Sequence, residues 1–180
     1  MAEPISDEPE VHSMALRDAD PSPTLSINAI QGTTSPQTRK VFGVFHHQPV
    51  LILMDFRSSH SFITPELIKR AKLRVLPCSP KVSIANGEKI SCLGKVSGSN
   101  VKVQDFQLKT EFFVFPLYGF DMVLGANWLH TLGPITWDFS KLTISFVTED
   151  TMVTLIGNSL ASMQYTPDVG VCSANISLYD

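Results

Sequence analysis

The sequence predicts an all-β domain with one or two short helices. Apolar and polar residues alternate at period two in a series of short runs between residues 25 and 157. Turn-forming residues separate these runs, and Asn86-Gly87 is the strongest hairpin signal among them. Helix signatures are confined to two short segments, near residues 65–71 and 126–132. With 180 residues and 43% apolar content, the chain can bury one compact core.

The ends of the chain are expected to lie outside this domain. Residues 1–24 are rich in Pro, Glu, Asp and Ser, and they hold too few large apolar side chains to offset the entropy of ordering. They predict a disordered leader. Residues 25–30 alternate and predict a strand, whereas residues 158–180 show no sustained period and predict a flexible tail. The predicted domain therefore spans residues 25–157.

A first hairpin is predicted where residues 40–45 and 49–54 flank a turn at His46-His47-Gln48. The two histidines could suggest a metal-ligand pair, but neighbours on a strand point to opposite faces, so a solvated turn is the favoured interpretation. Thr64 then supplies a helix N-cap, with Pro65 at the first helical position.

The second half of the chain continues the strand pattern. Residues 81–85 and 88–93 predict a hairpin around Asn86-Gly87, with a type I′ turn. Further strands are predicted at 100–108 and 110–115, with Gly98-Ser99-Asn100 as a turn between strands. Segment 121–125 predicts a strand that leads through Gly125 into the helix at 126–132. Residues 144–147 and 152–156 predict a last hairpin.

One carboxylate lies where a buried strand ends. The apolar run Leu51–Met54 predicts that strand, and Asp55 follows it at a turn rich in hydroxyl groups. A carboxylate in this place either caps the turn or is held for chemistry, and turn caps are far commoner among strand-end aspartates. The motif alone leaves both interpretations open.

Several segments in the same order carry a resemblance to a known family. They are Leu25–Ile30, the hairpin before Asp55, Val82–Glu88, Gly119–Gly125, Asn127–Leu129, Leu132–Ile135 and Trp137–Phe139. In order and spacing this set resembles the retropepsin-like aspartic protease domain of gypsy-type LTR retrotransposon polyproteins, particularly those of plants. The resemblance implies a closed β-barrel with a flap hairpin.

The resemblance also implies roles for particular residues. Asp55 matches the catalytic aspartate, and Ala85, Asn86 and Gly87 match the flap that closes over a peptide substrate. Val123, Leu124 and Gly125 match a structural loop that lies beside the catalytic loop. The partners implied are a second copy of the chain, because catalysis needs two carboxylates and this chain offers one suitable aspartate, and a polyprotein substrate.

The catalytic motif departs from the family pattern, which is Asp-Ser-Gly-Ser or Asp-Thr-Gly-Ala. Phe56 replaces the hydroxyl residue that links the two subunits, and Arg57 replaces the glycine that lets the substrate approach; Ser58 and Ser59 complete the loop. We expect impaired proteolysis and a weak homodimer. The alternative is a catalytically dead remnant or a protein-interaction module.

Composition narrows the remaining classes of function. The 14 basic and 17 acidic residues give a net charge of −3 and are scattered along the chain, so nucleic-acid binding is not expected. No Cys-x2-Cys or Cys/His ligand spacing occurs, and we expect neither a metal nor a cofactor. Three cysteines without paired spacing, Cys78, Cys92 and Cys172, predict reduced thiols, and no apolar run reaches the roughly 18 residues of a membrane span. We therefore expect a soluble, intracellular protein of the cytoplasm.

Overall fold

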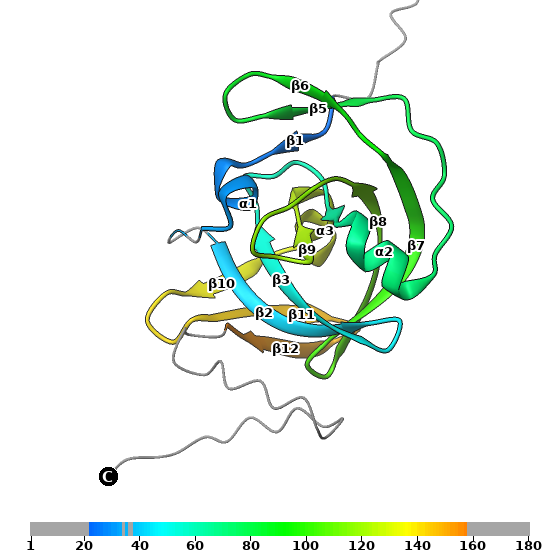
Figure 1. Cartoon of the computed structure of the whole chain (residues 1–180). Coiled ribbons are helices and arrows are strands. Elements are labelled where there is room, and N and C mark those ends of the chain that lie inside the picture. Colours follow the sequence, from blue (N-terminus) through cyan, green and yellow to red (C-terminus); the bar gives the residue numbers. More distant parts are fainter. Residues whose placement is uncertain (1–21, 34, 36–37, 158–180) are drawn as a thin grey trace, which may run out of the picture.

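The computed structural model describes residues 22–33, 35 and 38–157 of the chain. The predicted leader lies outside these residues except for its last three positions, and the predicted tail at 158–180 lies wholly outside them. Six strands close into a barrel, in agreement with the predicted all-β barrel fold (Figure 1). In barrel order they are β2 (Thr38–Phe45), β3 (Gln48–Asp55), β9 (Met122–Leu124), β4 (Phe62–Ile63), β8 (Phe106–Val114) and β7 (Gly94–Val103).

Two three-stranded sheets flank the barrel. One is formed by β1 (Thr24–Leu25), β5 (Lys81–Ile84) and β6 (Lys89–Ser91), and β1 pairs with β5 in parallel. The other is an antiparallel sheet of β10 (Ile135–Asp138), β11 (Thr143–Thr148) and β12 (Thr151–Ile156). The predicted hairpin near the C-terminal end of the domain is thus confirmed as β11 and β12.

The helices are short, and one of them corrects the sequence prediction. Those at α2 (Pro65–Ala71), α3 (Ala126–Leu129) and the 3₁₀ turn η1 (His130–Leu132) occur where they were predicted. The strand predicted at residues 25–30 is wrong, because the chain turns into α1 (Ile27–Gln31) after two residues of β1. The Ser26 side chain accepts a hydrogen bond from the Ala29 amide and so provides an N-cap that outweighs the period-two pattern.

The predicted turn at Gly98-Ser99-Asn100 is also wrong. Strand β7 runs through these residues with a register shift between Val96 and Ser99, and the turn to β8 lies at Gln104-Asp105. Gly98 has a φ of 64°, and this left-handed conformation is used in a β-bulge rather than in a chain reversal.

The predicted hairpin at Asn86-Gly87 is present, but its turn differs in type. Only Gly87 has a positive φ, of 85°, and the Gly87 amide donates to the Ile84 carbonyl over 2.8 Å. Three residues therefore close the hairpin, with glycine in the left-handed position, where a type I′ turn would need positive φ at two residues.

The prediction that the cysteines carry no paired arrangement is corrected for two of them. Cys78 and Cys92 form a disulfide, with their Cα atoms 6.7 Å apart. They lie just before β5 and just after β6, so the bond closes the base of this hairpin. The pairing is not visible in the spacing of the cysteines, because it depends on how the hairpin brings its two ends together. Cys172 lies outside the described residues.

Strand β3 separates two apolar clusters. Ile52 and Met54 belong to the larger cluster inside the barrel, whereas Leu53 belongs to a second cluster beneath β1 and β5. Alternate residues of a strand point to opposite faces, and here both faces are covered. The strand that leads to Asp55 is therefore fixed on both sides by packing.

Candidate functional site

Asp55 is the last residue of β3, at the carboxyl end of that buried strand. Strand β9 runs parallel to β3, with Leu53 paired to Val123 and Met54 to Leu124. The two predicted residues Val123 and Leu124 thus flank the strand that delivers the aspartate, and both are fully buried. Packing on both faces fixes the position at which Asp55 leaves the sheet.

The Asp55 side chain is enclosed within the single chain, with 0% exposed surface. Its Oδ1 atom accepts a hydrogen bond from the Arg57 amide over 3.0 Å, and its Oδ2 atom accepts one from Ser58 Oγ over 3.1 Å. The hydroxyl of Ser26 also donates to Oδ2. In this arrangement the carboxylate caps its own turn, because its oxygens satisfy donors that would otherwise be buried without partners.

Ser26 is a site residue that the sequence analysis missed. It lies 29 positions before Asp55 and is 6% exposed, and its amide donates to Ser58 Oγ over 3.1 Å. One signal could have found it, because serine is a preferred N-cap residue and Ser26 directly precedes Ile27-Asn28-Ala29-Ile30. Its contact with Asp55, however, depends on the parallel pairing of β1 with β5 and on the loop after β3.

Phe56 and Arg57 form the exposed corner of the turn. The Ser58 amide donates to the Asp55 carbonyl over 3.2 Å, which closes a four-residue β-turn. Neither Phe56 nor Arg57 is among the described residues that have a positive φ. The backbone of the turn therefore accepts a side chain at both positions without strain.

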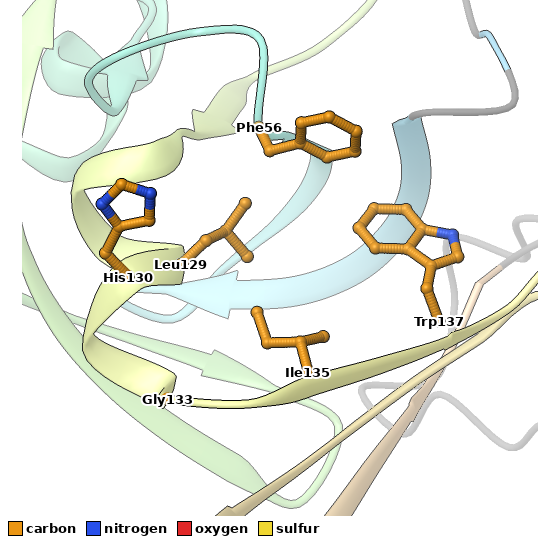
Figure 2. Close-up of a pocket in the computed structure, with 6 residues that line it drawn as sticks. All are labelled: Phe56, Leu129, His130, Gly133, Ile135 and Trp137. Carbon is orange, nitrogen blue, oxygen red and sulfur yellow. The ribbon is translucent and has the colours of Figure 1, made fainter.

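The Phe56 ring takes part in an aromatic surface beside the turn (Figure 2). It packs edge-on against Trp137 with ring centroids 5.8 Å apart, and it remains 46% exposed. Phe139 stacks on Trp137. The Arg39 guanidinium lies over both rings, 5.4 Å from the centroid of Trp137 and 5.2 Å from that of Phe139. Burial of this guanidinium lowers the pKa of Arg39. A pocket of about 340 Å³ opens here, lined by Phe56, Leu129, His130, Gly133, Ile135 and Trp137.

The start of α3 supports the rest of the loop. The Ala126 amide donates to the Ser58 carbonyl over 2.8 Å, and the Asn127 amide donates to the Ser59 carbonyl over 3.0 Å. Gly125 lies so close to the loop that a Cβ atom on it would come within 2.1 Å of the His60 carbonyl oxygen. Gly125 therefore lies directly against the loop that follows Asp55.

Ser59 connects the loop to the N-terminal strand. Its hydroxyl accepts a hydrogen bond from the Thr24 amide over 2.7 Å and lies 2.8 Å from His60 Nδ1. Its amide donates to the Thr24 carbonyl over 3.0 Å. The loop is thus bonded to β1 on one side and to α3 on the other.

Two other aspartates in the family-like segments are engaged away from Asp55. Asp121 pairs with Arg70 over 2.8 Å and accepts a hydrogen bond from the Leu51 amide over 2.9 Å. Asp138 accepts from the amide of Lys141 and from the hydroxyl and amide of Ser140, and these bonds hold the pKa of Asp138 below its ordinary value. None of these bonds joins Asp121 or Asp138 to Asp55.

The flap residues predicted from the sequence lie at the tip of the β5–β6 hairpin. Ala85, Asn86 and Gly87 are all exposed, and no atom lies within 4 Å of the position that a Cβ of Gly87 would take. The hairpin is anchored through β5, where the Ser83 amide donates to the Pro23 carbonyl over 2.8 Å. The tip is therefore free of the barrel, while its base is tied to the segment that contacts Ser59.

Comparison with known proteins places this site in a family. A model of the retroviral aspartyl protease family matches residues 24–152, and the chain belongs to this family. Among solved structures, the retroviral protease-like domain of Ddi1 from Leishmania major aligns with a TM-score of 0.54 and 12% sequence identity, covering 70% of this chain and 97% of that domain. At this identity the likeness concerns the fold. No curated protein matches the sequence.

The described residues contain no group of three or more His, Cys, Asp or Glu side chains placed to hold a metal ion. Within the same residues, no helix is both long enough and apolar enough to cross a membrane.

Proposed function

We propose that this retropepsin-like domain derives from an aspartic endopeptidase that cleaves a polyprotein as a homodimer, and that proteolysis is impaired in the present chain. The observation that carries the proposal is the state of Asp55. Its carboxylate is fully buried and bonded to Ser26 and Ser58, while Phe56 stands in place of the hydroxyl residue. The domain has the family's fold and aspartate, with a modified loop around them.

The intact reaction needs two carboxylates that share one proton. One carboxylate takes a proton from the attacking water, and the other donates a proton to the peptide carbonyl. Because each chain offers one such group, each subunit of a dimer would supply its own Asp55. Asp121 and Asp138 are bonded elsewhere and are not proposed as the second group.

Two features of the loop oppose this chemistry. Ser26 and Ser58 both donate to Oδ2 of Asp55, so the atom that would exchange a proton with water is already occupied within the chain. Two copies of Arg57 near a dyad would also favour two ionised carboxylates and oppose sharing of a proton. Loss of activity follows from either effect.

Phe56 also changes the means by which two subunits would dimerise. Phe56 cannot exchange hydrogen bonds with a partner loop, so we propose a weak dimer. The exposed ring edge of Phe56, together with Trp137 and the 56% exposed Phe139, instead offers an apolar contact. This aromatic surface favours the second candidate function, in which the domain binds another protein without cleaving it.

Origin and location belong to the same proposal. The ordered motifs from Leu25 to Phe139 support descent from a gypsy-type LTR retrotransposon polyprotein. We propose that the protein acts in the cytoplasm.

Restoring the family motif tests the impairment. In Phe56→Ser with Arg57→Gly, the serine would return the hydrogen bonds between subunits and the glycine the clearance for substrate. Hydrolysis of a peptide library should then appear, with a bell-shaped pH profile on the acidic side of neutrality. Either change alone should restore much less, because the two residues share one turn.

The control is the same double variant with Asp55→Asn, which should be inactive. Sedimentation would show whether each protein dimerises. Cleavage by the unmodified chain that Asp55→Asn abolishes would overturn the proposed impairment. A folded, dimeric double variant without activity would show that the lesion extends beyond Phe56 and Arg57.

A further inference from the structure

A second recess in the surface lies away from Asp55, between the β2–β3 turn, the chain after α2, and β7. It has a volume of about 680 Å³. The segment after α2 runs beside β7 in Figure 1 and forms one wall. We call this recess the β7 groove. Its lining residues are Val44, His46, His47, Leu73, Arg74, Leu76, Val96, Ser97, Gly98, Ser99, Asn100, Lys102 and Gln107.

Part of strand β7 forms the floor of the β7 groove, and this part has no neighbouring strand on its edge opposite β8. Strand β2 pairs with β7 only at residues 101–103, and Leu76 forms an isolated bridge with Lys95. Between these contacts, no strand or bridge of the described part of the chain pairs with residues 96–100 along the edge opposite β8. An unpaired strand edge is a template to which an extended peptide can add.

The walls of the groove combine apolar and basic groups. Val44 and Leu76 are large apolar residues that remain 44% and 42% exposed. Arg74 and Lys102 line the groove, and Lys109 extends across Gly98, with its Nζ 3.8 Å from the position of a Cβ there. None of these three cations forms an ion pair within the described residues.

The groove has no acidic residue in its lining. The carboxylate next to it is Glu111, which bonds to Ser97 over 2.8 Å and to Lys95 over 3.0 Å. Its charge is therefore matched by Lys95, and the charges of Arg74, Lys102 and Lys109 remain uncompensated. A ligand that suits this groove is extended, acidic and partly apolar.

The chain itself contains such a segment. Residues 1–21 hold six acidic residues and one basic residue, whereas residues 22–157 hold nine acidic and thirteen basic residues. The stretch from Glu10 to Asp20 has no proline and carries Val11, Met14 and Leu16 among its acids. Twenty-one residues can extend over about 70 Å, and a domain of this size has a radius of gyration of about 14 Å, so the segment can reach any face.

We propose that the β7 groove binds the acidic N-terminal segment of the same chain, residues 3–20, with part of the proline-free stretch Glu10–Asp20 extended along the free edge of β7 at residues 96–100. The apolar residues of the segment would pack on Val44 and Leu76, and its carboxylates would face Arg74, Lys102 and Lys109. This proposal is independent of whether Asp55 is catalytic. It assigns an intramolecular ligand to a surface outside the protease site.

Carbodiimide cross-linking of the full chain tests the proposal, because this reagent joins carboxylates to lysine amines that are in contact. Mass spectrometry of the monomer should find amide bonds from Lys102 or Lys109 to acids within residues 3–20. The yield should fall about tenfold in Arg74→Glu, which keeps both lysines as reporters, and in 0.5 M salt. Lys141→Glu makes the same charge change at the β10–β11 turn and should leave the yield unchanged.

A second variant guards against misfolding. If Arg74→Glu disturbs the fold, as judged by circular dichroism, Asp18→Asn with Asp20→Asn removes the charge from the segment instead and should lower the yield. Mixing chains with and without ¹⁵N distinguishes the source of the segment. Bonds only between differently labelled chains would overturn the proposal in favour of a second copy, and absence of bonds to Lys102 and Lys109 would overturn it entirely.

Discussion

Replacement of Ser26 by alanine should destabilise the domain by roughly 2.5–4 kcal/mol. The hydroxyl serves two groups, since it caps α1 at the Ala29 amide and donates to the buried Asp55 carboxylate. An N-cap contributes about 1 kcal/mol, and a hydrogen bond to a carboxylate contributes about 1.5–3 kcal/mol. Urea unfolding followed by circular dichroism would measure the loss, with Ser26→Thr as the control that keeps the hydroxyl.

A double-mutant cycle separates the two contributions. In an Asp55→Ala background the carboxylate is absent and the capping bond remains, so Ser26→Ala should cost only about 1 kcal/mol. A coupling of at least ~1 kcal/mol between the two positions is therefore expected. Additive losses, within about 0.5 kcal/mol, would refute the view that Ser26 holds the Asp55 carboxylate.

Three further outcomes are expected. Gly125→Ala should destabilise the domain by about 3 kcal/mol in urea unfolding, because the new Cβ would meet the His60 carbonyl oxygen; a loss below about 0.5 kcal/mol would contradict this packing. Partial burial alone would raise the pKa of Glu111, but hydrogen bonds from Ser97 and Lys95 hold this pKa below its ordinary value. The Glu111 carboxylate therefore stabilises the fold above pH 4.5, and this stabilisation is lost as the pH falls through the lowered pKa. Glu111→Gln should thus cost about 0.5 kcal/mol near pH 7 and nothing near pH 2, and an equal cost at both would exclude the linkage. Cys78→Ser should lower stability by about 3 kcal/mol in non-reducing buffer, and the same substitution should have little effect once a thiol reductant has opened the bond to Cys92 in the parent.

The barrel could be predicted because its strands carry local signals. The apolar run before Asp55 and the turn at His46-His47 are each visible within a few residues, and the structure forms a hairpin there with positive φ at both histidines. The prediction failed where a single residue changed the local outcome. Ser26 ended a strand by capping a helix, and Gly98 produced a bulge where a turn was expected.

The candidate site was predictable only in part, for a physical reason. Asp55, Phe56 and Arg57 follow one another along the chain, so the motif names them together. Ser26 joins Asp55 only through tertiary packing, and the aromatic contact of Phe56 with Trp137 spans two sheets. No local pattern encodes such contacts, and a resemblance based on motifs passes over residues that the motif does not contain.

The short segment from Pro23 to Ser26 connects the β5–β6 hairpin to the loop that follows Asp55. On one side it is hydrogen-bonded to β5 of the β5–β6 hairpin, through the Ser83 amide. On the other side it is hydrogen-bonded to Ser59 and Ser58, and through Ser26 to Asp55 itself. The segment therefore acts as a mechanical link. A displacement of the base of the β5–β6 hairpin would therefore be transmitted through Pro23–Ser26 to the hydroxyl that bonds to the Asp55 carboxylate.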